Sequence, residues 1–154
     1  MNKKLFNSIG FCTDFSEGAD QAFIVARELA VQFDAFLVII HVMSNFSISP
    51  PVHAAYMPVK YDQEFFEEVT QADLKSLKEK YVEKLPAGLH YDIILESGHA
   101  ATEILRITME KSIDLLVMGS HGLTGLAHVL FGSTADRVVQ KAGCSVITVR
   151  FSKQ

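Results

Sequence analysis

The strongest constraint on the fold of this chain is an alternation between two patterns of apolar residues. Five short apolar runs are typical of strands, and between them apolar residues recur every three or four positions, as on one face of a helix. The predicted strands are residues 5–11, 36–42, 90–95, 114–118 and 145–150. The predicted helices are residues 19–33, 62–84, 100–111 and 134–142. This alternation implies right-handed crossovers and therefore an α/β fold, an open parallel five-stranded sheet with helices on both faces.

Local signals refine this prediction. Residues 36–42 are almost continuously apolar, as expected for a strand that is buried on both faces. Ser16 is a predicted N-cap for the first helix. Residues 44–60 hold three of the four prolines of the chain and are predicted to form a long surface loop. Because the alternation resumes directly after this loop, we predict a single domain over residues 1–154.

The composition excludes several classes of protein. With 49% hydrophobic and 21% charged residues, the chain has the composition of a globular domain. A net charge of -4 argues against sequence-independent binding of nucleic acid. Every apolar run is shorter than the roughly 18 residues that span a membrane, and the N-terminal segment is too polar for a signal peptide. Cys12 and Cys144 are predicted to be buried, reduced thiols, with a disulfide as the alternative, so we expect a cytoplasmic protein.

A glycine-rich passage follows the fourth predicted strand. Gly119 and Gly122 lie at its end, and nine residues separate Gly122 from Gly132, which Ser133 and Thr134 follow. Glycine lets a backbone turn sharply and approach a ligand closely. The N–H groups of such a loop, together with the start of the next helix, form a concavity suited to phosphate. The passage therefore predicts a site for the phosphates of a nucleotide.

The turn after the first predicted strand supplies a second part of the predicted nucleotide site. Ligands of open α/β sheets lie beyond the carboxyl ends of the strands, at the point where the strand order reverses. If the first and fourth strands are neighbours, Asp14 faces the glycine passage across a crevice. Asp14 could then accept hydrogen bonds from a base or ribose, while residues 119–134 surround the phosphates.

The same residues also have purely structural interpretations. Ser133 and Thr134 could cap the last helix, which is compatible with binding because both use the same helix end. Asp14 could be an Asx-turn residue. These alternatives stay open at the level of the sequence.

The six histidines show no metal-ligand spacing, and the two distant cysteines do not complete a zinc site. His41 is expected to be a packed, hydrogen-bonded side chain at a strand end. His121 and His128 could approach the phosphates, but solvated loop histidines are the expected outcome. We therefore predict no metal site built by the protein alone.

Familiar catalytic motifs are missing from the sequence. A Walker A loop places a lysine directly after its glycine, whereas Ser133 follows Gly132 here. There is no Gly-x-Ser-x-Gly elbow. The first strand leads into residues 13–16, Thr-Asp-Phe-Ser, instead of the Gly-x-Gly-x-x-Gly of dinucleotide oxidoreductases. We expect a binding protein rather than a dedicated enzyme, and slow ATP hydrolysis is left open.

The order and spacing of these pieces resemble the universal stress protein family over essentially the whole chain. The family signature, Gly-x2-Gly-x9-Gly-(Ser/Thr), reads here as Gly119, Gly122, Gly132 and Ser133. Residues 13–17, 41–42 and 144–150 resemble the family's first-strand turn, second-strand ending and last strand. One departure is the absence of a proline directly after Gly98.

The resemblance implies a Rossmann-like fold with sheet order 3-2-1-4-5. It also implies a homodimer that pairs the last strands of two subunits, residues 146–150. The ligand implied is ATP, with Mg²⁺ as a bridge between its phosphates. Asp14 and Val42 would contact the adenine and ribose, and Thr13 and Met118 would line the same pocket. The implied phosphate-binding residues are Gly119, Gly122, Gly132, Ser133 and Thr134.

Two functional hypotheses follow. In the first, the chain is an ATP-binding regulatory protein of the stress response, and the intact glycine spacing favours it. In the second, it is a dimeric stress-response module that binds no nucleotide and acts through protein contacts. Neither hypothesis includes a nucleic-acid or membrane partner.

Overall fold

The computed structural model of the chain describes residues 4–44, 63–122 and 131–151. Its contacts divide the chain into two compact units. The larger unit consists of residues 1–44 and 85–154, and the smaller unit of residues 45–84. The described part of the smaller unit is the helix α2 (Gln63–Lys80), followed by the short 3₁₀ helix η2 (Val82–Lys84).

The larger unit is built on a five-stranded sheet in which every neighbouring pair of strands is parallel. Its order is β3-β2-β1-β4-β5, so the predicted fold class and strand order are confirmed. The strands are β1 (Ser8–Thr13), β2 (Phe36–Ser44), β3 (Tyr91–Gly98), β4 (Leu115–Gly119) and β5 (Ser145–Val149). The helices are α1 (Glu17–Phe33), α3 (Ala100–Glu110) and α4 (Ser133–Lys141).

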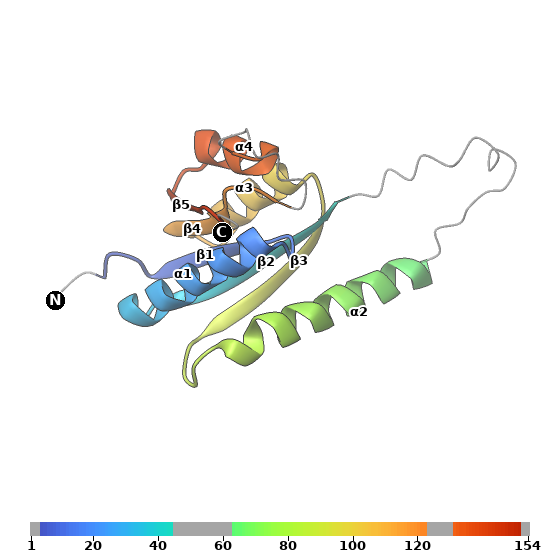
Figure 1. The fold of residues 1–154 in the computed structure, drawn as a ribbon, viewed down its shortest axis with the longest axis horizontal. Helices are drawn as coiled ribbons and strands as arrows, with labels where there is room; N and C mark the ends of the chain where they lie inside the picture. Colours follow the sequence, from blue (N-terminus) through green and yellow to red (C-terminus); the bar gives the residue numbers. More distant parts are fainter. Residues whose placement is uncertain (1–3, 45–62, 123–130, 152–154) are drawn as a thin grey trace, which may run out of the picture. The chain divides into compact units, whose positions relative to one another are not determined.

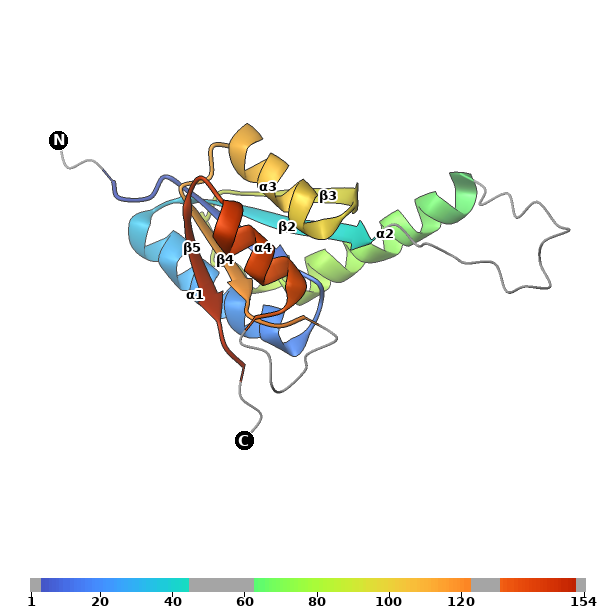
Figure 2. The same cartoon turned by 90° about the horizontal axis from the view of Figure 1, so that it is seen from above.

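Helices cover both faces of this sheet (Figures 1 and 2). α1 packs on one face, against β1 and β4, while α3 and α4 pack on the other. β2 supplies apolar side chains to both faces: Val38 and Ile40 join the cluster under α3 and α4, while Leu37 and Ile39 alternate with them and are fully buried. This confirms the prediction of a strand buried on both faces. Its ends depart from the pattern: Phe36 has 41% of its surface exposed, Val42 is half-buried and Ser44 is exposed.

The ends of β1 and β3 differ from the sequence prediction. β1 begins at Ser8 rather than at residue 5, because the Asp114 carboxylate accepts hydrogen bonds from the N–H groups of Asn7 (2.7 Å) and Ser8 (3.0 Å) where the strand starts. It continues beyond residue 11, where pairing with β2 extends it to Thr13. β3 runs to Gly98 rather than residue 95, because the extended β2 offers it a partner up to Ser44.

The helix starts and ends are close to those predicted, with one exception. The Ser16 hydroxyl accepts a hydrogen bond from the Ala19 N–H (3.2 Å), which confirms the predicted N-cap of α1. The exception is the helix predicted over residues 62–84. Its α-helical part ends at Lys80, and the chain then tightens into the 3₁₀ turn η2, a common way for a helix to end.

Candidate functional site

A cavity of about 260 Å³ opens at the carboxyl ends of β1, β2 and β4, where the starts of α3 and α4 close it. This volume is near the lower end of the range of small-molecule sites. β1 and β4 are neighbours in the sheet, as the sequence prediction of a crevice required. The loops that follow these two strands diverge and leave space between them. All nine residues predicted to bind a ligand line this cavity: Thr13, Asp14, Val42, Met118, Gly119, Gly122, Gly132, Ser133 and Thr134.

The turn after β1 is held by its own side chains. The Thr13 hydroxyl accepts a hydrogen bond from the Phe15 N–H (2.9 Å), and the Asp14 carboxylate accepts one from the Ser16 N–H (3.0 Å). Asp14 is therefore an Asx-turn residue, and its carboxylate also faces the cavity. Phe15 has a φ of 64°, a left-handed conformation that is rare for an aromatic residue. Such strain persists only where the surroundings hold it.

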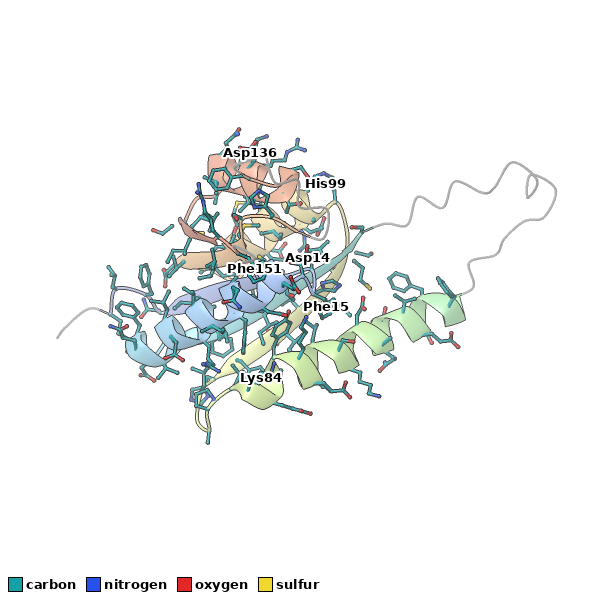
Figure 3. The ribbon with its side chains drawn as sticks, in the orientation of Figure 1. Asp14, Phe15, Lys84, His99, Asp136 and Phe151 are labelled. Carbon is teal, nitrogen blue, oxygen red and sulfur yellow. The ribbon has the colours of Figure 1, made fainter. Side chains whose placement is uncertain are left out.

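His41 supports the same turn from β2. Its Nδ1 lies 2.8 Å from the carbonyl oxygen of Thr13, and since a carbonyl only accepts, this nitrogen carries the donated hydrogen. The Phe15 ring packs on the imidazole with 4.5 Å between ring centroids. His41 is 8% exposed, so the prediction of a packed, hydrogen-bonded histidine is confirmed. Figure 3 marks Asp14 and Phe15 at the end of β1.

The two described ends of the glycine passage are joined to each other and to the sheet. The Gly132 N–H donates to the Ser120 carbonyl (2.7 Å), and the Ser120 N–H donates to the Val149 carbonyl of β5 (2.9 Å). Ser120 is completely enclosed, with 1% of its surface exposed. Gly132 is therefore held beside the end of β4, although twelve residues separate it from Gly119 in the chain.

Gly122 and Gly132 differ in how much room the protein leaves for a side chain. A Cβ on Gly122 would collide with Oδ2 of Asp14, so the glycine lets the two loops of the cavity meet. A Cβ on Gly132 would lie 3.6 Å from its nearest neighbours, Cα of His121 and the Ser120 carbonyl, which is ordinary contact. The space around Gly132 and its φ of -67° would therefore both allow a residue with a side chain. A methyl group there would occupy space at the cavity.

The start of α4 corrects one structural interpretation of the sequence. The N-cap of α4 is Gly132, and no side chain caps the helix. Ser133 and Thr134 lie in the first turn, so the interpretation of their hydroxyls as helix caps is wrong. The first N–H groups of a helix have no partner within it and carry partial positive charge. At α4 they belong to residues that line the cavity, the arrangement in which helix starts bind anions.

Few ionisable side chains line the described part of the cavity. They are Asp14, His121 and the thiol of Cys12, whose pKa burial raises far above its usual value, so that it stays uncharged. His121 Nδ1 lies 3.0 Å from the Ser120 hydroxyl oxygen. His128 lies outside the described residues. No lysine or arginine occurs among the described residues that line the cavity.

The sequence analysis missed several lining residues. Ile40 stands two positions before Val42 on β2 and so points to the same face, a signal that strand periodicity could have supplied, while Cys12 lies on β1 just before its carboxyl end. α3 contributes Ala100 through its first turn, and no local pattern marks this residue. The remaining lining residues are Ser16, Ala19, Ser44, Ile104, Ser120, Ala135 and His121, the last of which was expected to be solvated.

The described residues contain no group of three or more histidine, cysteine, aspartate or glutamate side chains that could hold a metal ion. None of the helices in this part of the chain is long and apolar enough to cross a membrane. Cys12 and Cys144 are both free thiols, as predicted, although Cys144 is only half-buried.

Known proteins match this chain over nearly its whole length. The chain is 34% identical to the universal stress protein YxiE of Bacillus subtilis, over 95% of this chain and all of the relative. Among solved structures, the universal stress protein UspA from Lactobacillus plantarum superimposes with a TM-score of 0.75 at 25% identity, over 97% of this chain and all of that one.

Two structures with the same fold were solved with nucleotides bound. A universal stress protein in complex with cAMP matches with a TM-score of 0.62 at 19% identity, over 96% of this chain and 99% of that one. The Archaeoglobus fulgidus universal stress protein in complex with dAMP matches with a TM-score of 0.58 at 17% identity, over 94% of this chain and 98% of that one. At these identities the likeness shows the shared fold.

The family model supplies the last comparison. The model of the universal stress protein family matches residues 5–150, a range that includes every strand of the sheet and the whole glycine passage. Fold, signature spacing and relatives therefore agree, and the chain belongs to the universal stress protein family.

Proposed function

We propose that this chain binds ATP in the cavity at the carboxyl ends of β1 and β4, and that it acts as a regulatory protein of the stress response. The observation that carries the proposal is the convergence of all nine sequence-predicted binding residues around one cavity. These residues lie on or directly beside β1, β2, β4 and α4, which are far apart in the chain. Such convergence of polar groups and backbone at a strand-order reversal is typical of a ligand site.

The cavity offers different surroundings to the different parts of a nucleotide. Ile40, Val42 and Met118 give it an apolar wall, which suits a base. Thr13 and Asp14 supply oxygens for the base or ribose. The start of α4 suits the phosphates, because its first N–H groups need acceptors. The two relatives solved with cAMP and dAMP support an adenine nucleotide as the ligand.

The charge of the site supports Mg²⁺ as a companion of ATP. Residues 119–134 contain no lysine or arginine, and Asp14 adds a negative charge beside Gly122. A triphosphate at this place needs a cation to offset its charge. Mg²⁺ is commonly held by substrate phosphates with few protein ligands, which fits a chain that offers no metal cluster among its described residues.

Calorimetric titration of the purified protein tests this proposal. We expect micromolar binding of ATP in the presence of Mg²⁺, and an affinity lower by about tenfold or more in EDTA, because the phosphate charge is then uncompensated. Binding by neither ATP nor AMP would contradict the proposal. It would favour the second hypothesis, a dimeric module that acts through protein contacts alone.

We also propose that two chains pair through β5. In the described sheet β5 has β4 as its one neighbour, and such an edge is a template for another strand. The Ser145 N–H donates to the Asp114 carbonyl just before β4, and the Val149 carbonyl accepts from the Ser120 N–H just after it, so the backbone groups of Ser145 and Val149 face inward. Because backbone groups of successive strand residues point to opposite sides, the N–H groups of Val146 and Thr148 face outward, toward a partner.

A proline at Thr148 tests this pairing. Thr148→Pro removes an outward N–H and is expected to convert a dimer into a monomer that stays folded, because edge strands tolerate proline when the lost N–H faces outward. Light scattering after size-exclusion chromatography measures the mass. Ile147→Pro is the matched control: it removes an inward-facing N–H and should destabilise the fold. A wild-type monomer at high concentration would overturn the proposal.

Two further points belong to the same proposal. We place the protein in the cytoplasm, because both cysteines are free thiols, as in reducing compartments. We regard residues 1–154 as one domain, because the family model spans both compact units without a break.

A further inference from the structure

Gly18 is a buried glycine in the first turn of α1. It does not line the cavity, although its neighbours Ser16 and Ala19 do. Glycine within a helix is less favourable than alanine. Its helical conformation can be adopted by any residue. The reason for a glycine at this position therefore lies in what surrounds it.

The backbone of the glycine passage approaches Gly18 from the other side. A Cβ on Gly18 would lie 2.9 Å from the carbonyl oxygen of His121. Conversely, a Cβ on Gly119 would lie 3.0 Å from the carbonyl carbon of Gly18 and 3.2 Å from its oxygen. The first turn of α1 and residues 119–121 are thus in backbone contact, with no room for a side chain from either side.

Both partners of this contact are held in place. The Ser16 cap and the hydrogen bond from the Asp20 N–H to the Ser16 carbonyl (3.0 Å) fix the start of α1. On the opposite side, the hydrogen bonds of Ser120 to Val149 and Gly132 fix the passage to β5 and to the start of α4. A group inserted between them must displace backbone, because the atoms that it would meet closer than 3.4 Å all belong to the backbone.

We infer that Gly18 is a positioning residue for the phosphate-binding part of the site. Its missing side chain lets residues 119–121 lie against α1, which sets the position of their backbone relative to the start of α4. The inference rests on the proposed nucleotide function. Gly18 acts through the passage, so its effect should be confined to the phosphates and should spare the base and ribose, which meet β1 and β2.

The test compares ATP with adenosine, which lacks the phosphates. Dissociation constants of Mg-ATP and adenosine are measured by calorimetry for the wild type and Gly18→Ala, with melting temperatures as a check on folding. We expect the variant to bind Mg-ATP about tenfold more weakly or worse, the effect of losing a hydrogen bond to a charged group. Adenosine affinity should stay within about twofold. A merely structural role would not change the ratio of the two affinities.

Gly143→Ala is the matched control, because a Cβ there has no heavy atom within 4 Å, and both affinities should stay unchanged. If Gly18→Ala does not fold, Gly119→Ala replaces it. The methyl group of Gly119→Ala would lie 3.0 Å from the Gly18 carbonyl carbon and 3.2 Å from the His121 carbonyl oxygen, slightly farther than the 2.9 Å at Gly18. The same change in the ratio of ATP to adenosine affinity is expected. An unchanged ratio in the folded variant overturns the inference, whereas a wild type that binds no ATP overturns the proposed function instead.

Discussion

Gly132→Asp is expected to lower the affinity for Mg-ATP by more than about a hundredfold while leaving the fold as stable as in the wild type or more so. Gly132 is the N-cap of α4, in the extended conformation (φ -67°, ψ 160°) that N-cap residues adopt. Aspartate is among the best N-cap residues, and its charge also suits the helix dipole. The neighbours of a Cβ at this position are at ordinary contact distance, so the protein itself accepts the side chain.

The loss of binding follows from charge and from space. At an effective dielectric constant of about 20, two unit charges about 5 Å apart repel by about 3 kcal/mol, which is more than a hundredfold in affinity. The carboxylate would also accept the N–H groups that the phosphate needs. Affinity is measured by calorimetry and stability by urea unfolding. The affinity for Mg-ATP should fall, while the free energy of unfolding should stay the same or rise.

Gly132→Asn is the control for this variant. Asparagine has nearly the same shape and is an equally good N-cap, but it carries no charge. Its affinity for Mg-ATP should therefore lie between those of the wild type and Gly132→Asp. If the aspartate variant binds Mg-ATP as tightly as the wild type, the phosphates do not lie at the start of α4, and the proposed orientation of the nucleotide is wrong.

Phe11→Ala is expected to lower the free energy of unfolding by about 3–5 kcal/mol, the usual cost of removing a large buried aromatic side chain. Phe11 is fully buried on β1, the central strand, and its ring packs on Phe23 of α1 with 5.4 Å between centroids. Removing the ring leaves a cavity between the sheet and α1. Urea denaturation followed by circular dichroism measures the change.

The same substitution at an exposed site is the control. Phe36 starts β2 with 41% of its surface exposed, so Phe36→Ala should cost less than about 1 kcal/mol. Equal losses for the two variants would show that α1 and the sheet do not share a tightly packed core.

Periodicity located each strand and helix of the larger unit correctly, because apolar spacing reports which residues are buried and by what kind of element. It misplaced the ends of strands, which depend on partners. β1 reaches Thr13 because His41 stands opposite, and β3 reaches Gly98 because Ser44 does. No local pattern in either strand contains that information. The sheet order likewise came from the resemblance of motifs to a family, and periodicity alone leaves it open.

For a similar reason, the position of the site could be predicted from the sequence, but the role of each glycine could not. The spacing of Gly119, Gly122 and Gly132 marked the passage, because few local structures need three glycines so placed. Why each glycine is needed was not predictable from spacing. At Gly122 the reason is the carboxylate of Asp14, more than a hundred residues earlier in the chain, while at Gly132 the protein leaves room for a side chain.

By itself, the sequence determined the α/β class, the position of the elements, the N-cap at Ser16 and the residues of the glycine signature. These follow from burial, capping and backbone freedom, which act over a few residues. The tertiary structure alone decided that the turn after β1 meets the glycine passage, that Gly132 rather than Ser133 is the N-cap of α4, and that Gly18 lies against His121. These facts depend on the close approach of segments far apart in the chain, and packing settles them only once every element is in place.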